Sequence, residues 1–136
     1  MNRSLAAFLL LLTFAALASV PFMANSAELS KDSLDTVLKN VTAEKAVLVD
    51  VREKKEWDAG HVEGAIFLPL SALKKGVDAE TLAKVLPADK FLYIHCVVGK
   101  RAVTAGNVLE EFEYAVRPIK PGYEELIEAG FEKAED

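Results

Sequence analysis

Short apolar runs alternate along the chain with longer segments in which apolar and polar residues mix. The runs are too brief for helices, so each predicts a buried strand: residues 46–50, 65–70, 91–96 and 114–119. The mixed segments carry capping residues or apolar positions at helical spacing and predict helices: residues 30–40, 53–60, 78–87, 101–112 and 123–130. This alternation predicts an α/β fold, an open parallel sheet of about five strands with helices on both faces.

The first 26 residues follow a different pattern from the rest of the chain. Arg3 precedes a continuous apolar stretch at residues 5–18, and small residues occupy positions 24–26. This layout predicts a secretory signal at residues 1–26, followed by a single domain at residues 27–136 that is periplasmic or secreted. An uncleaved signal would instead tether the domain to a membrane, because the apolar stretch is nearly long enough to span one.

The predicted domain is acidic. It contains all 21 Asp and Glu residues and all but one of the 16 Lys and Arg residues. A negative net charge disfavours nucleic acid and anionic membrane surfaces as partners. The two histidines and the single cysteine do not have the spacing of a zinc site, so no metal is expected.

The only cysteine, Cys96, ends the third apolar run. It has no partner for a disulfide within the chain, so its thiol is buried, joined to another chain, or reactive. Open α/β sheets place their functional sites at the carboxyl ends of strands, which is the position predicted for Cys96. A tight turn from Val97 to Lys100 into a helix at Arg101 would direct backbone N–H groups towards an anion, either the Cys96 thiolate or an anionic substrate. Gly99 supplies the permissive backbone for that turn, and this pattern favours a reactive cysteine over a structural one.

Two separated motifs resemble the single-domain rhodaneses, a family of sulfurtransferases. The segment VLVDVREKKEWDAGHVEGAIFLPL is similar to the family's D-x-R, E-[aromatic] and G-H-[aliphatic]-x-G-A pattern. The segment CVVGKRA is similar to its active-site loop, C-x-x-G-x-R. The resemblance runs from about Ser33 to Glu132, and the signal makes the exported, periplasmic members the most similar. It implies a rhodanese-like fold.

The resemblance also implies a chemical cycle. Cys96 as thiolate would attack the outer sulfur of a small anionic donor such as thiosulfate, hold it as a persulfide, and pass it to a thiol or to cyanide. The cycle needs no metal and no organic cofactor, and the protein is expected to act as a monomer. The motif implies a loop that binds the substrate: Val97, Val98, Gly99, Lys100 and Arg101.

Other residues of the motifs are interpreted as supporting the site. Asp50 and Arg52 end a predicted strand and are expected to form an internal ion pair or loop tether. The resemblance implies that His61 shapes the fold and takes no part in catalysis. His95 adjoins Cys96, but neighbours on a strand point to opposite faces, so we expect a structural role for His95 rather than that of the thiol's base.

The sequence departs from the family pattern and leaves two alternatives open. Many family loops carry a polar or cationic residue directly after the cysteine, whereas Val97 and Val98 are apolar, which predicts weaker binding of a dianion. One alternative is a non-catalytic module that carries sulfur or binds a partner. The other is a phosphatase of the same fold, whose C-x₅-R loop is one residue longer than the loop between Cys96 and Arg101.

Overall fold

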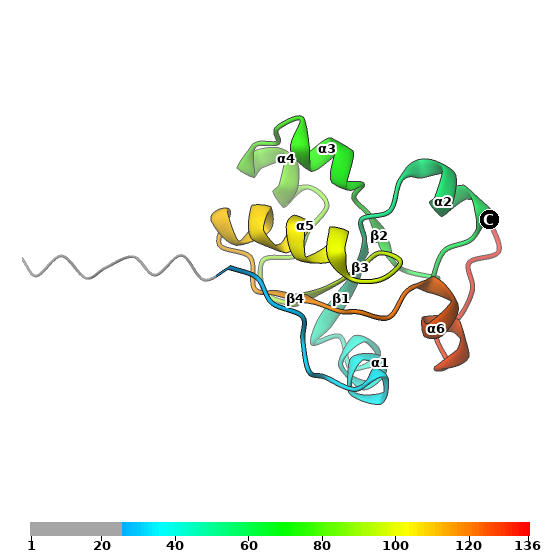
Figure 1. Ribbon diagram of the computed structural model, residues 1–136. Helices are drawn as coiled ribbons and strands as arrows, with labels where there is room; N and C mark the ends of the chain where they lie inside the picture. Colours follow the sequence, from blue (N-terminus) through cyan, green and yellow to red (C-terminus); the bar gives the residue numbers. More distant parts are fainter. Residues whose placement is uncertain (1–25) are drawn as a thin grey trace, which may run out of the picture.

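The computed structural model describes residues 26–136, which fold around one parallel sheet (Figure 1). Its strands lie in the order β2-β1-β3-β4: β1 (Ala46–Asp50), β2 (Ile66–Phe67), β3 (Phe91–His95) and β4 (Val116–Pro118). The predicted α/β fold with an open parallel sheet is therefore confirmed. The described residues form four strands, one fewer than the approximate number expected from the sequence.

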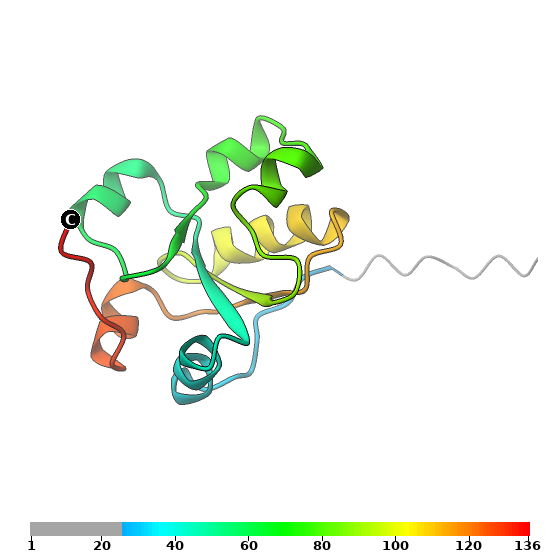
Figure 2. The ribbon, with the colours of Figure 1, turned by 180° about the vertical axis from the view of Figure 1, so that it is seen from behind.

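Helices cover both faces of the sheet (Figures 1 and 2). Above it in Figure 1 lie α3 (Leu70–Lys74), α4 (Ala79–Ala83) and α5 (Lys100–Glu111), and below it lie α1 (Leu34–Thr42) and α6 (Tyr123–Glu128). The short helix α2 (Lys54–Ala59) follows β1 at the carboxyl edge of the sheet. Each face has its own apolar core, as expected for a sheet buried on both sides.

The central strands β1 and β3 alternate between these two cores. Leu92 and Ile94 pack under α3, α4 and α5, whereas Tyr93 packs against α1 and α6. Cys96 continues the first of these series and belongs to the core under α5. Neighbouring side chains on a strand point to opposite faces, so His95 and Cys96 separate as the sequence predicts.

One strand differs from the sequence prediction. The run 65–70 forms a strand only at β2, because Pro69 cannot donate a backbone hydrogen bond and instead stands at the start of α3. Helix α5 buries Ala102, Ala105, Gly106 and Leu109, and Val108 and Phe112 pack against the same core. Small residues let α5 approach the sheet closely, since a Cβ at Gly106 would lie 2.9 Å from Pro118 Cγ.

The segment before α1 lies along α5 and β4. The Ala27 amide donates a 2.6 Å hydrogen bond to Asn107 Oδ1, and the Ser30 amide donates one of 2.7 Å to the Pro118 carbonyl. The predicted signal covers residues 1–26, and residues 1–25 lie outside the described part of the chain. Within residues 26–136, no helix has the length and apolar character needed to cross a membrane.

Candidate active site

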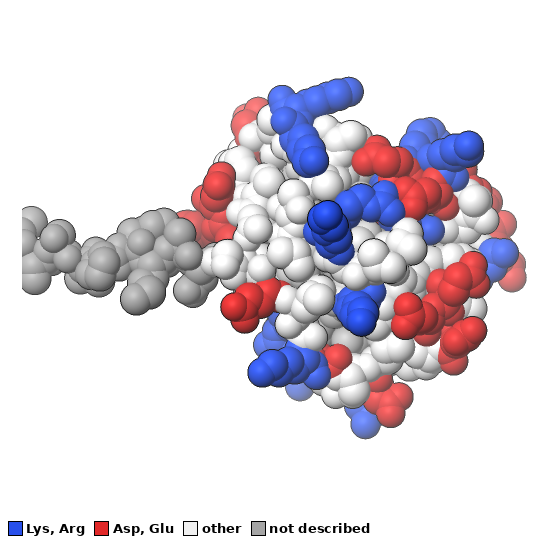
Figure 3. Space-filling model, viewed as in Figure 1, with Lys and Arg blue, Asp and Glu red and all other residues white. Residues whose placement is uncertain are grey.

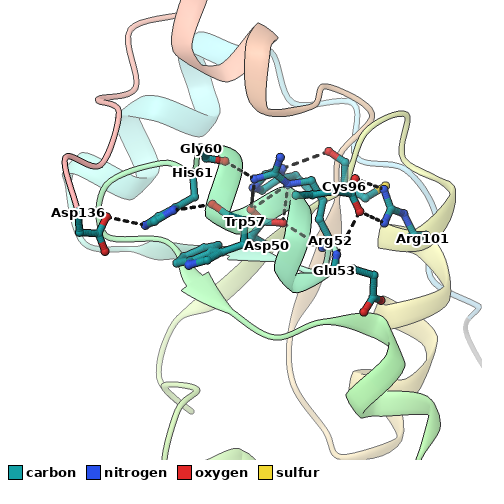
Figure 4. Close-up of polar contacts among 11 residues, drawn as sticks. Asp50, Arg52, Glu53, Trp57, Gly60, His61, Cys96, Arg101 and Asp136 are labelled. Atoms are coloured by element: carbon teal, nitrogen blue, oxygen red, sulfur yellow. Dashed lines mark hydrogen bonds and ion pairs between the residues drawn. The ribbon is translucent and has the colours of Figure 1, made fainter.

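Cys96 follows β3 directly and lies at the carboxyl edge of the sheet (Figure 4). Its side chain is only 1% exposed, and its Sγ accepts a 3.2 Å hydrogen bond from the Gly99 amide. A single backbone N–H therefore already points at the sulfur. This is the start of the anion cradle that the sequence predicts.

The turn after Cys96 depends on Gly99. Gly99 has a φ of 94°, in the left-handed region that side chains rarely adopt, and it forms the N-cap of α5. The first backbone bond of α5 runs from the Val103 amide to the Gly99 carbonyl. The N–H groups of residues 100–102 therefore have no partner inside the helix, and they add to its positive end beside the sulfur.

The remaining loop residues border the mouth of the site. Val97 and Val98 are 49% and 67% exposed, and Lys100 is exposed too. None of the three side chains forms a hydrogen bond or ion pair to another described residue. The loop thus combines a buried sulfur with an apolar and basic edge.

Arg101 extends from the start of α5 to the carboxylate of Glu56 on α2. Its Nη1 and Nη2 donate to the two carboxylate oxygens at 2.6 and 2.9 Å. Hydrogen bonding to Arg101 lowers the pKa of Glu56 to about 2, and the same bonds raise the pKa of Arg101. The guanidinium is therefore held in place next to the loop, with most of its charge compensated by Glu56.

Glu56 owes its position to the way α2 begins. Glu53 is the N-cap of α2, and the Glu53 amide donates to Glu56 Oε1 at 3.2 Å in a capping box. The Glu53 carboxylate in turn accepts a 2.6 Å hydrogen bond from the Ser71 hydroxyl at the start of α3. Glu56 is the acid of the E-[aromatic] motif, but its contact with Arg101 and the role of Glu53 were not predicted, although their spacing of three residues at a helix start is a recognisable capping signal.

Asp50 and Arg52 form the expected ion pair beneath this site. Arg52 donates from Nε and Nη2 to the carboxylate of Asp50 at 2.8 to 3.1 Å, and both side chains are buried. Arg52 Nη2 also donates to the Gly60 carbonyl at 2.8 Å, and the guanidinium lies over the Tyr123 ring. The pair therefore links the end of β1 to the loop after α2 and to α6.

The two histidines contact backbone groups rather than the sulfur. His95 is buried, with Nδ1 3.3 Å from the Cys96 carbonyl oxygen and Nε2 3.5 Å from Asp50 Oδ2, and burial lowers the pKa of its imidazole. His61 donates to the Trp57 carbonyl at 3.0 Å and stacks on the Trp57 ring at 3.6 Å. Both contacts hold loops in place, which fits the structural roles predicted for these residues.

The segment before α6 supports the loop from the other side. A Cβ at Gly122 would lie 2.6 Å from the Val97 carbonyl oxygen and 3.1 Å from that of Cys96. Only a glycine allows this approach. The sequence shows Pro121-Gly122-Tyr123 here, whereas the contacts of Leu29 and Lys120 with Gly99 were not foreseen from the sequence.

The described residues offer no arrangement of three or more His, Cys, Asp or Glu side chains suited to a metal ion. The chemistry that residues 96–101 themselves can supply is that of a buried sulfur nucleophile beside a helix N-terminus. Comparison with known proteins identifies the family that shares this arrangement. The family of rhodanese-like domains matches residues 33–129.

The chain belongs to the rhodanese-like domain family. It is 29% identical over 105 residues to the human thiosulfate:glutathione sulfurtransferase, covering 71% of this chain and 91% of that protein. It is 41% identical over 61 residues to the probable adenylyltransferase/sulfurtransferase MoeZ of Mycobacterium tuberculosis, covering 45% of this chain. The first curated relatives are much longer, and the chain spans only 14 to 19% of their length.

A solved structure gives the same fold. The crystal structure of a rhodanese-related protein from Thermoplasma volcanium aligns with a TM-score of 0.60 at 23% identity, covering 76% of this chain and 95% of that one. At this identity the likeness concerns the fold alone. The family match and the sequence relatives support an enzyme of the sulfurtransferase type at the level of the family.

Proposed function

We propose that this rhodanese-like domain is a sulfurtransferase that moves sulfane sulfur from a donor such as thiosulfate to a thiophilic acceptor through a persulfide on Cys96. The observation that carries the proposal is the 3.2 Å hydrogen bond from the Gly99 amide to Cys96 Sγ at the start of α5. An N–H donor and a helix N-terminus both stabilise a sulfur anion. The attacking thiolate and the persulfide are both such anions.

The first half-reaction loads the enzyme. The Cys96 thiolate attacks the outer sulfur of thiosulfate, the new sulfur–sulfur bond forms on Cys96, and sulfite leaves with the electron pair of the broken bond. The N–H groups of residues 99–102 would hold the outer sulfur of the persulfide, which carries the charge. Val97, Val98 and Lys100 would border the donor as it enters, and Arg101 would fix the loop through Glu56.

The second half-reaction returns the enzyme to its starting state. An acceptor such as cyanide or a thiolate attacks the outer sulfur, the bond to Cys96 breaks, and the Cys96 thiolate leaves. No net oxidation or reduction of the protein occurs over the cycle. Asp50, Arg52 and His61 support this site by fixing the loops around it rather than by touching the sulfur.

A phosphatase reaction is less well supported. Four residues separate Cys96 from Arg101. Both terminal nitrogens of the Arg101 guanidinium donate hydrogen bonds to Glu56. A phosphate ester needs a wider cradle and a free cation at its base. A non-catalytic sulfur carrier remains the alternative reading, since the same persulfide would form without turnover.

We also propose that residues 1–26 direct export, so that the domain acts in the periplasm or outside the cell. The packing of Ala27 against α5 supports a domain boundary at this point, because the described fold already includes that residue. N-terminal sequencing of protein recovered from the periplasm tests the cleavage, and an uncleaved chain in the membrane fraction would contradict it.

The function is tested by incubating the protein with thiosulfate, desalting it and measuring its intact mass. We expect a gain of one sulfur atom that disappears when cyanide is added, with thiocyanate as product. Turnover with both substrates present separates an enzyme from a carrier, since a carrier would release about one thiocyanate per protein. Hydrolysis of a phosphate ester without sulfur loading would overturn the proposal.

A further inference from the structure

Exposed apolar side chains gather around the mouth of the candidate site. Among residues 26–136, four large apolar side chains are exposed, namely Leu29 (41%), Val85 (48%), Val97 and Val98. Val97 and Val98 belong to the loop above Cys96, and Val85 lies elsewhere, after α4. Two of the four therefore belong to the active-site loop.

Leu29 lies beside the same loop, together with a lysine. A Cβ at Gly99 would lie 2.9 Å from Leu29 Cδ2 and 3.1 Å from Lys120 Cα, so both residues contact the loop at Gly99. We call the set Leu29, Val97, Val98, Lys100 and Lys120 the acceptor rim. It combines residues from the segment before α1, the loop after β3 and the segment after β4.

The acceptor rim is basic within an acidic protein. The chain has a net charge of −5, yet neither Lys100 nor Lys120 has an ion-pair partner among residues 26–136. In Figure 3, Lys and Arg side chains lie amid uncharged surface at the centre of the face that carries the start of α5, and acidic side chains gather to the right of them. Of the nearby acids, Glu56 is bound to Arg101 and Glu53 to Ser71.

We propose that the acceptor rim docks a polypeptide segment that presents the acceptor thiol, a cysteine flanked by apolar side chains with acidic side chains beyond them. This inference rests on the proposed function of Cys96. The apolar flanks would cover Leu29, Val97 and Val98, and the acids would meet Lys100 and Lys120. Apolar side chains exposed in a cluster are typical of a surface that binds another molecule.

The depth of the sulfur favours a protruding thiol on a larger partner. Cys96 is 1% exposed, and a persulfide extends only about 2 Å beyond Sγ. An attacking thiolate must therefore come close to the buried sulfur, as a cysteine at the tip of an extended segment can, while its neighbours rest on the rim. Cyanide or a small inorganic donor would reach the sulfur without contacting Leu29 or Lys120.

The transfer step balances without any further reagent. The acceptor thiolate forms a bond to the outer sulfur of the Cys96 persulfide while the bond from that sulfur to Cys96 Sγ breaks. Cys96 leaves as a thiolate, and the acceptor cysteine becomes the persulfide. Contacts to the rim would hold the two sulfurs in line, which favours the reaction by proximity and orientation.

The test uses the full protein loaded on Cys96 by thiosulfate, or by inorganic polysulfide if thiosulfate fails to load it. Three acceptors are compared in single turnover: cyanide, a pentapeptide thiol with leucines beside a central cysteine and glutamates at both ends, and the same peptide with lysines in place of glutamates. We expect the acidic peptide to react roughly tenfold faster, at low concentration, than the basic one.

Variants locate the effect on the rim. Leu29→Ser and Lys120→Glu should each lower the ratio of the acidic-peptide rate to the cyanide rate by about fivefold. A variant that makes the Cys96 persulfide less reactive in general lowers both rates and leaves this ratio unchanged. The matched controls are Val85→Ser, which is similarly exposed outside the rim, and Lys74→Glu on α3; both should leave the ratio unchanged.

Three results would overturn the proposal. Equal rates for the two peptides, or a ratio that the rim variants do not change, would refute the rim while leaving sulfur transfer to cyanide intact. Dimerisation in sedimentation experiments that Leu29→Ser abolishes would make the rim an interface between two copies of this chain. Failure of Cys96 to load from either sulfur source would refute the proposed function and the inference with it.

Discussion

Arg101 and Glu56 lie 45 residues apart in the sequence and are joined by two charge-assisted hydrogen bonds of 2.6 and 2.9 Å. The pair connects the start of α5, next to the nucleophile, to α2, which follows β1. It fixes the position of Arg101 beside the loop that contains Gly99. The Gly99 amide and the N-terminus of α5 add positive potential at Cys96.

The ion pair predicts how the free energy of unfolding depends on pH. Because the folded-state pKa of Glu56 is lowered to about 2 from 4.5, its contribution is fully present above its unfolded pKa and is lost as the pH falls towards 2. Arg101→Met should remove this contribution, about 1 kcal/mol after solvent screening of a pair that is one-third exposed.

The measurement is the free energy of unfolding in urea from pH 6 to pH 2, within the range where Glu56 titrates. We expect wild type and Arg101→Met to differ near neutral pH and to converge at the acid end. Glu56→Gln should behave in the same way, and the double variant should add little to either single change. A constant difference at every pH would show that the pair contributes no linked protonation.

Cys96→Ser should abolish both the mass gain of one sulfur and the release of thiocyanate. Serine has nearly the size of cysteine, so the fold should remain and the melting temperature should change little. Circular dichroism and thermal melting check the fold, and intact-mass measurement checks the loading. Sulfur transfer that persists in this variant would exclude Cys96 as the nucleophile.

Val97→Arg should improve the use of thiosulfate. Val97 is half exposed at the mouth of the site, so an arginine side chain fits there without disturbing the core. The added cation attracts the dianion in both ground state and transition state, and we expect KM to fall by about threefold or more with kcat little changed. Val85→Arg, which adds the same charge after α4, serves as the control and should leave KM unchanged.

Gly122→Ala should lower both stability and kcat. Its new Cβ would meet the Val97 and Cys96 carbonyl oxygens, so the active-site loop has to move, at a cost of about 1–3 kcal/mol. Gly64→Ala is the matched control, since Gly64 has a φ of 76° but open space around its Cβ. It should cost about 1 kcal/mol through the backbone alone and leave kcat unchanged. Equal kcat values in the two variants would show that Gly122 does not support the loop.

The order of strands and helices followed from the sequence because apolar runs and helical spacing are local signals. The same signals located Cys96 at the end of β3 and Gly99 at the turn into α5, as the structure confirms. The predicted end of the second strand was wrong, because the turn at Pro69 into α3 depends on where β2 pairs with β1.

Only the tertiary structure decided which residues surround the active-site loop. Glu56 reaches Arg101, and Leu29 and Lys120 reach Gly99, only because the parallel sheet brings the ends of distant segments to one edge. The contacts of Leu29 and Lys120 carry no local period or motif that a sequence could show. The sequence by itself determined the nucleophile, its turn and the order of the fold, whereas contacts between distant segments determined how the loop is fixed and what borders it.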